Sequence, residues 1–80
     1  MILKFTFVLL LIIFIITMRT GTVKFFNESK GYGFITDEET GKDIFVHASG
    51  LIDKIQEDDI VNFDIVDDER GKKAINVKRA

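Results

Sequence analysis

The chain has 80 residues, which is enough for one small domain with a modest hydrophobic core. It contains no cysteine, which excludes disulfides and thiolate metal sites, and its single histidine, His47, excludes a histidine-rich metal cluster. The formal net charge is −2, so any attraction to a polyanion must come from a local positive patch.

The first seventeen residues, MILKFTFVLLLIIFIIT, differ in composition from the rest of the chain. The 14 residues from Phe5 to Met18 carry no charge, whereas a membrane-spanning helix needs roughly 17–25 apolar residues. The run fits the centre of a signal peptide, typically about 7–15 residues, but no small-residue cleavage site follows it. Because the segment is apolar all round, a helix there would fit each of these roles and would not distinguish them. Without residues 1–17 the chain has 10 basic and 13 acidic residues, a net charge of −3.

The first strand is predicted from Thr20 to Asn27, a stretch rich in β-branched and aromatic residues. Val23 is expected to face the core and Lys24 the solvent. The adjacent pair Phe25-Phe26 breaks strict alternation, so a bulge or a strong twist is expected there.

Two further strands are predicted at 32–37 and 43–47, joined by a polar hairpin loop whose Gly41 suits a positive φ. Side chains alternate along a strand, so each strand presents two different faces. One face carries aliphatic residues and glycine, namely Gly33, Ile35, Ile44 and Val46. The other face carries four flat rings, namely Tyr32, Phe34, Phe45 and His47.

The connection from Ala48 to Asp59 has no sustained helical pattern, although Leu51, Ile52 and Ile55 could seat one helical turn against the core. A fourth strand is predicted at 60–66 and a fifth at 72–78, with a charged hairpin loop between them at 67–71. Alternation places Val61, Phe63 and Ile65 inward on the fourth strand. On the fifth it places Ala74, Asn76 and Lys78 on one face, and Ile75 and Val77 on the other.

Five short strands without an intervening helix predict an all-β fold, a small five-stranded antiparallel OB-fold barrel. This class binds oligonucleotides on the face of its second and third strands. An RNA-recognition motif domain is disfavoured, because that fold needs two packing helices.

The rings on the second and third strands are not needed for the core, because Ile35, Ile44 and Val46 already supply the inward face. Rings with nearby positive charge stack on bases and hold a phosphate backbone. Phe63 is expected in the core, and Phe26 is undecided between core and surface. Gly31 and Gly33 are expected to keep the surface around Tyr32 low, so that a nucleic-acid strand can approach closely.

Three segments together resemble the bacterial cold-shock proteins. Lys30 to Ile35 resembles the first ribonucleoprotein motif, Ile44 to His47 resembles the second, and Gly21 to Asn27 precedes them in the right order. The resemblance runs from about Met18 to Ala80. It implies ligand contacts at a set of rings and lysines, namely Lys24, Phe25, Phe26, Lys30, Tyr32, Phe34, Phe45 and His47.

The resemblance also implies a cytoplasmic binder of single-stranded RNA and DNA, acting as an RNA chaperone or as a regulator of transcription or translation. We expect a monomer, because nothing in the sequence indicates oligomerisation. It implies no catalysis, cofactor, metal or small-molecule substrate. Three departures from the family pattern predict weaker binding or a shorter footprint. Phe25 stands where tryptophan is usual, Ala48 stands where an aromatic residue is common, and residues 49–59 contain no ring.

The resemblance bears on the domain organisation, which we predict as residues 1–17, an apolar segment, and 18–80, the cold-shock domain. Such domains usually start within a few residues of their first methionine, which favours translation from Met18. The alternative is a signal or anchor that tethers a nucleic-acid binder to the inner membrane.

Two other functional classes have less support in the sequence. An enzyme is disfavoured, because no nucleophile–base arrangement or metal-ligand spacing stands out, and the acidic runs at 37–39 and 67–69 fit solvated hairpin tips. A binding module for proteins or oligosaccharides stays open, because OB-folds also serve other ligands.

Overall fold

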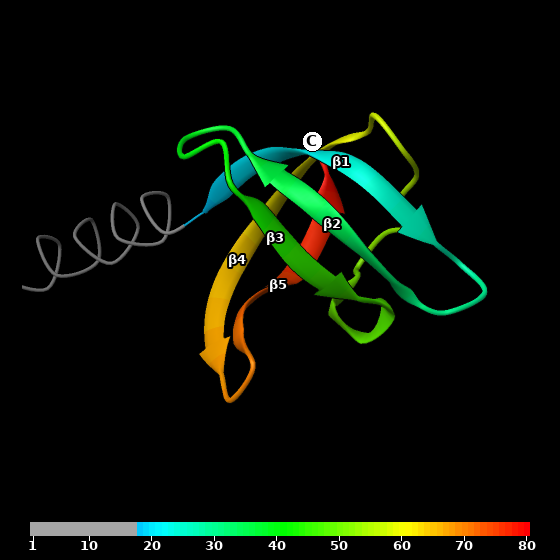
Figure 1. The fold of residues 1–80 in the computed structure, drawn as a ribbon. Helices are drawn as coiled ribbons and strands as arrows, with labels where there is room; N and C mark the ends of the chain where they lie inside the picture. The colour runs from blue at the N-terminus through cyan, green and yellow to red at the C-terminus, as the bar shows by residue number, and fades with distance from the viewer. Residues whose placement is uncertain (1–17) are drawn as a thin grey trace, which may run out of the picture.

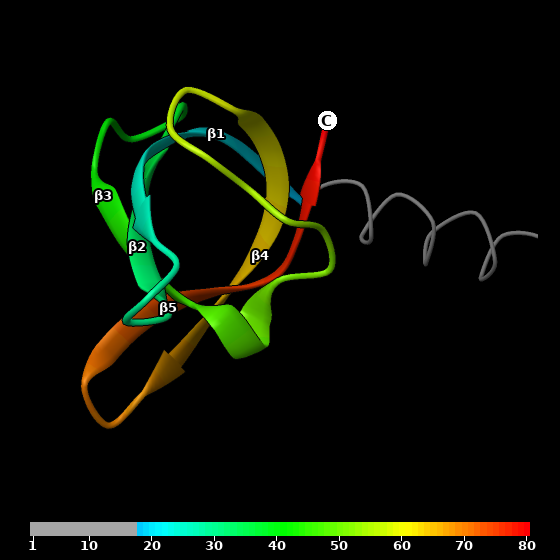
Figure 2. The ribbon, with the colours of Figure 1, turned by 90° about the vertical axis from the view of Figure 1, so that its right-hand side faces the viewer.

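The structure is a computed structural model that describes residues 18–80, and the expectations for residues 1–17 lie outside the described residues. Five strands wrap into a closed barrel, seen from the side in Figure 1 and turned by 90° in Figure 2. The elements are β1 (Arg19–Asn27), β2 (Tyr32–Asp37), β3 (Asp43–His47), the 3₁₀ helix η1 (Ala48–Gly50), β4 (Ile60–Asp68) and β5 (Gly71–Arg79). Within residues 18–80 there is no helix long and apolar enough to cross a membrane.

The strand order around the barrel is β1-β2-β3-β5-β4, which confirms the predicted all-β OB-fold class. Neighbouring strands are antiparallel except β3 and β5, which run parallel where the barrel closes. This parallel contact places Phe45 opposite Lys73 and Val46 opposite Ala74. Closure therefore brings the first part of β5 beside the third strand.

The core formed by residues 18–80 is aliphatic with a single buried ring, that of Phe63. Alternation on β2 and β3 is as predicted, with one side of each strand buried and the other partly exposed. The buried hydrophobic residues come from all five strands and from the connection before β4: Val23, Ile35, Ile44, Val46, Ile55, Val61, Phe63, Ala74 and Val77. Branched side chains of this size fill a narrow barrel closely.

The predicted alternation of β5 is wrong. Ala74 and Val77 are both buried although they are three residues apart, whereas Ile75 is only half-buried. Asn76 lies between them with a φ of +52°, a left-handed conformation that interrupts the pleat. The kink moves Val77 onto the face of Ala74.

Strand β4 continues to Asp68, two residues beyond its predicted end, so the loop to β5 is shorter than expected. The connection after β3 also differs from its prediction. Its helical turn is the 3₁₀ helix at Ala48–Gly50. Ile55 is buried and Leu51 packs against the core as expected, but Ile52 is 64% exposed.

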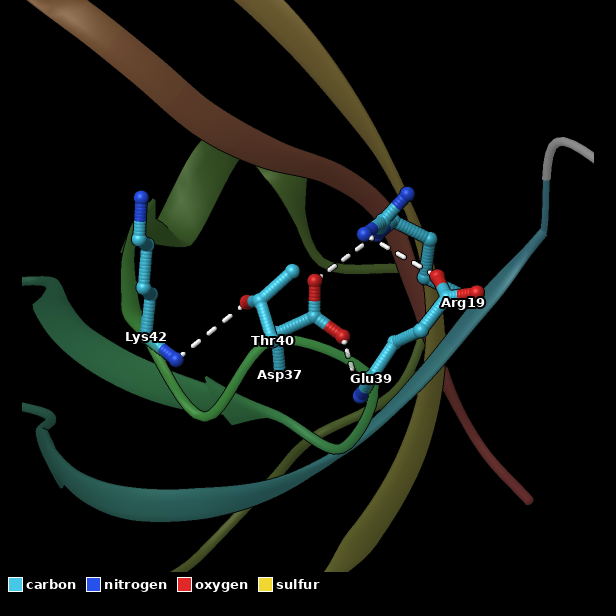
Figure 3. A network of polar contacts seen from close by, with 5 residues as sticks. All are labelled: Arg19, Asp37, Glu39, Thr40 and Lys42. Atoms are coloured by element: carbon cyan, nitrogen blue, oxygen red, sulfur yellow. Dashed lines mark hydrogen bonds and ion pairs between the residues drawn. The ribbon is translucent and has the colours of Figure 1, made fainter.

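Ion pairs tie the start of β1 to the end of β2 and to the loop that follows it (Figure 3). Asp37 is 1% exposed, and its Oδ2 accepts a hydrogen bond from Arg19 Nε at 2.8 Å. Its Oδ1 accepts from the backbone amide of Glu39 at 3.0 Å, and the Glu39 carboxylate pairs with the same arginine at 3.1 Å. The buried carboxylate thus uses both oxygens, which its burial requires.

Asp37 should make folding sensitive to acid. Burial alone would raise the pKa of Asp37, but the Glu39 amide and the Arg19 guanidinium together hold it below its ordinary value. Stability gained this way is present above the ordinary pKa of about 3.9 and is lost as the pH falls through the lower, folded value.

We expect Asp37→Asn to lower the free energy of unfolding at pH 7 by about 1–3 kcal/mol, because a charged hydrogen-bond acceptor is lost. The variant should also lose less stability between pH 6 and pH 3 than the wild type. Urea denaturation at several pH values measures both effects. Glu57→Gln, at an exposed carboxylate, is the control, and an Asp37→Asn curve that matches it would contradict this account.

Candidate nucleic-acid interface

A β-bulge in β1 decides which of its two adjacent phenylalanines faces outward. Val23 pairs with Ile35 and Phe25 pairs with Phe34, so Lys24 is the extra residue, one position before the Phe25-Phe26 pair at which the sequence predicts a bulge or a strong twist. Phe25 is therefore exposed beside the outward ring of Phe34, whereas Phe26 packs against the core.

Four rings from three strands form one contiguous cluster on the outer face of β1, β2 and β3, which we call the ring face (Phe25, Tyr32, Phe34, Phe45). The Phe25 centroid lies 6.1 Å from that of Tyr32 and 5.5 Å from that of Phe34. The Phe45 centroid lies 6.2 Å from that of Tyr32 and 5.9 Å from that of Phe34. Each ring thus contacts two others, and these contacts hold the rings in place without burying them.

Gly33 has a different role from the predicted one. A Cβ built on Gly33 would lie 2.3 Å from the Phe25 carbonyl oxygen and 2.8 Å from Phe26 Cα, so the residue faces inward, toward β1. It permits the close approach of β1 and β2 and does not lower the surface around Tyr32. Gly31 does adopt a positive φ, of +74°, in the turn that precedes β2.

Lys24 is held at the edge of the ring face by an ion pair. Its Nζ lies 2.7 Å from Asp43 Oδ2, and Thr36 Oγ1 donates to Asp43 Oδ1 at 2.9 Å. These two hydrogen bonds, from Lys24 first and from Thr36, lower the pKa of Asp43. The lysine is 57% exposed and therefore still reachable by an anionic ligand.

Lys30 lies in the turn between β1 and β2, on the side where Tyr32 begins the next strand. Its backbone amide donates to Asn27 Oδ1 at 3.0 Å, and the Gly31 amide donates to the Asn27 carbonyl at 2.8 Å. These bonds fix the backbone of the turn. Within residues 18–80, the ammonium group of Lys30 takes part in no ion pair.

His47 ends β3 opposite Tyr32 and also caps the 3₁₀ helix η1. Its Nδ1 accepts a hydrogen bond from the Ser49 amide at 3.1 Å and lies 2.8 Å from Ser49 Oγ. Because Nδ1 acts as the acceptor, the proton of the neutral ring is on Nε2. The imidazole is exposed and has a fixed orientation beside the ring face.

The sequence prediction missed a cleft of about 530 Å³ between the ring face and the β4–β5 hairpin, which we call the hairpin cleft. The hairpin extends beyond the body of the barrel in Figures 1 and 2. The cleft is lined by rings on one side and mainly by charged residues on the other: Phe34, Phe45, His47, Ser49, Asp68, Arg70, Gly71, Lys72 and Lys73. The parallel β3–β5 contact creates it, and no local sequence pattern predicts that contact.

The structure gathers most of the predicted site residues on one side of the barrel. Phe25, Tyr32, Phe34 and Phe45 form the ring face, His47 lies next to it, and the two lysines flank it at Lys24 and Lys30. Phe26 is the exception, since it packs against the core and leaves only part of its ring accessible. The ligand contacts of all eight residues stay predictions.

The closed five-stranded barrel, with partly exposed rings on the outer face of β1–β3, is an OB-fold domain. The model of the 'Cold-shock' DNA-binding domain matches residues 19–80. The chain therefore belongs to the cold-shock domain family.

Curated relatives are similar over nearly their whole length. The chain is 45% identical over 62 residues to a cold shock-like protein of Aquifex aeolicus, covering 72% of this chain and 89% of the relative. It is 44% identical over 66 residues to the major cold shock protein of Micrococcus luteus, covering 78% and 98%. It is 47% identical over 64 residues to cold shock protein 1 of Lactiplantibacillus plantarum, covering 75% and 96%.

Two solved structures share the barrel. Drosophila Unr CSD456 matches with a TM-score of 0.67 and 27% identity, over 79% of this chain and 26% of that chain. A Cu(II)-bound variant of CusF from Escherichia coli matches with a TM-score of 0.58 and 15% identity, over 80% and 90%, which shows the fold alone.

Proposed function

We propose that this chain binds single-stranded RNA and DNA through the ring face, as a cytoplasmic monomer that acts as an RNA chaperone or regulates transcription or translation. Nucleic-acid binding in general follows from membership of the cold-shock domain family. The finer proposal rests mainly on one observation, the cluster of four rings on a strand face whose opposite side already fills the core.

The ring face suits bases that are not paired. In a duplex the faces of the bases are stacked on one another, whereas a single strand can turn each base onto a protein ring. The Tyr32 and Phe45 rings are nearly parallel, at 22°, while the Phe34 and Phe45 rings lie at 73°. Bases must therefore stack at several inclinations, which a flexible single strand can do and a rigid helix cannot.

Two cations are placed to hold the phosphates between stacked bases. Lys30 lies at one side of the ring face and Lys24 at another, and Asp43 neutralises part of the charge of Lys24. Few phosphates are then contacted, and stacking supplies most of the affinity. We propose no catalytic role and no cofactor. Among residues 18–80 there is no group of three or more histidine, cysteine or carboxylate side chains placed to hold a metal ion.

Phe34→Ala should weaken the binding of a single-stranded heptamer by roughly 5- to 150-fold, because one stacked base is worth about 1–3 kcal/mol. Fluorescence anisotropy of a labelled oligonucleotide measures the affinity, and urea denaturation measures the stability. Phe63→Leu, in the core, is the matched control: it should lower stability and leave the affinity of the folded protein unchanged. Unfolding of Phe34→Ala, or unchanged binding by it, would contradict the assignment of Phe34 to a binding surface.

Lys30→Gln should weaken binding and flatten its salt dependence. Each phosphate contact on a single strand contributes about −0.7 to the slope of log K against log salt, so the slope should become less negative by about that amount. Lys78→Gln, on β5, removes the same charge away from the ring face and should leave the slope unchanged. Equal slopes for all three proteins would show that Lys30 contacts no phosphate.

The footprint should be short, because Ala48 and the connection at 49–59 provide no ring. OB-folds cover roughly 4–16 nucleotides, and we expect the affinity to stop rising at about seven bases. A series of oligonucleotides from four to twelve bases, titrated at one salt concentration, measures this. Affinity that still rises beyond eight or nine bases would show that other residues extend the interface.

A further inference from the structure

Asp68 is a carboxylate that lines the hairpin cleft together with three rings and three cations. It ends β4 and opens the turn into β5. In a surface that binds a polyanion, an ionised carboxylate repels phosphate, so its presence among the rings needs a chemical explanation.

The geometry keeps Asp68 ionised and in a fixed position. Its Oδ1 accepts a hydrogen bond from the Arg70 amide at 2.8 Å, and its Oδ2 lies 3.5 Å from Lys73 Nζ. The Arg70 amide lowers the pKa of Asp68, burial opposes this, and Lys73 lowers it further. The side chain is 39% exposed, so a ligand in the cleft can reach it.

An ionised carboxylate can only accept hydrogen bonds, and its two oxygens offer about four lone-pair positions. Two of them are used by Arg70 and Lys73, which leaves acceptor capacity for a ligand. Any group that approaches these oxygens closely must therefore be a donor. Phosphate oxygens and base carbonyls are excluded, whereas amino groups on a base edge are accepted.

The rest of the cleft favours a base as the group that meets Asp68. Phe34, Phe45 and His47 provide flat walls, and the volume of about 530 Å³ lies within the range of small-ligand pockets. Arg70 and Lys72 line the same cleft and, within the described part of the chain, form no ion pair. They can hold a flanking phosphate while the base lies between the rings.

Resting on the proposed single-strand binding, we propose that Asp68 makes the hairpin cleft select a base that carries an exocyclic amino group. Cytosine and uracil are the diagnostic pair, because they have the same ring size and differ at one edge. Cytosine presents its 4-amino group, which aspartate accepts well, where uracil presents a 4-carbonyl oxygen that the carboxylate repels. The cleft is thereby selective for cytosine over uracil.

The test compares the affinities of the full chain for the DNA heptamers dC7 and dU7, with wild-type protein and Asp68→Asn at one salt concentration. The asparagine oxygen can still accept from the Arg70 amide, and its NH₂ group can donate to the uracil carbonyl. We expect the ratio of the two affinities to shift toward dU7 by about three- to tenfold in the variant.

Asp67→Asn is the matched control. It removes the same charge one residue earlier on the same strand, and its side chain does not line the cleft. Both heptamers should bind it somewhat more tightly and by the same factor, so the ratio should equal that of the wild type. Asp68→Ser, whose hydroxyl can also accept from Arg70, repeats the test if the asparagine variant does not fold.

The outcomes separate this inference from the proposal on which it rests. If both Asp68 and Asp67 variants raise the two affinities by one common factor, the carboxylate acts only as a charge and the inference is overturned. If wild-type protein binds neither heptamer, single-strand binding itself is overturned, and the inference is overturned with it. A ratio that shifts in Asp68→Asn and not in Asp67→Asn supports base selection.

Discussion

The narrow interior of the barrel is the constraint on which the rest of the structure depends. Its buried hydrophobic residues are aliphatic except for one ring, Phe63, and the described residues leave no buried side-chain donor or acceptor without a partner. Four more phenylalanine or tyrosine rings cannot fit into such a space. The bulge at Lys24 turns Phe25 outward, and alternation does the same for the rings of β2 and β3, so one packing limit produces both a closed core and a contiguous aromatic surface.

The sequence predicted those features of the fold that depend on neighbouring residues alone. The limits of β2 and β3, their two faces, the presence of an irregularity in β1 (one residue before the predicted pair) and the positive φ of Gly41 follow from residues within a few positions of one another. The predictions fail where the structure is determined by a single backbone angle or by a contact between residues far apart in the sequence. Asn76 adopts a left-handed φ that alternation cannot anticipate. The parallel contact of β3 with β5 joins residues 28 positions apart, Phe45 and Lys73, and only this contact turns a charged hairpin into one wall of a cleft.

Within residues 18–80 the carboxylates beside the rings are paired, whereas Lys30, Arg70 and Lys72 form no ion pair, which explains how an acidic chain can present a surface suited to a polyanion. Asp43 pairs with Lys24 and Asp68 with Lys73, each at the margin of the rings. Paired exposed charges contribute little net attraction over distance, because salt and the opposite charge screen them. In the function that we propose, flat hydrophobic area therefore carries most of the interaction, and the cations position the strand. The same pairing fixes the orientation of the carboxylates, which can then act as directional acceptors for donors on a base edge.

At two positions this chain has a smaller ring, or no ring, where the family usually has an aromatic residue. Phe25 offers a smaller ring than tryptophan, and Ala48 offers none, so the stacking area is concentrated on Tyr32, Phe34 and Phe45. Stacking tolerates any base, because every base has a π-face, so a domain that depends on stacking alone discriminates weakly. Discrimination needs polar groups at fixed positions near the rings. The hairpin cleft supplies them, with His47 oriented by Ser49 and Asp68 oriented by the Arg70 amide. In this chain the smaller ring area is accompanied by polar groups placed beside the rings, and we propose that the rings supply the affinity and these polar groups the selectivity.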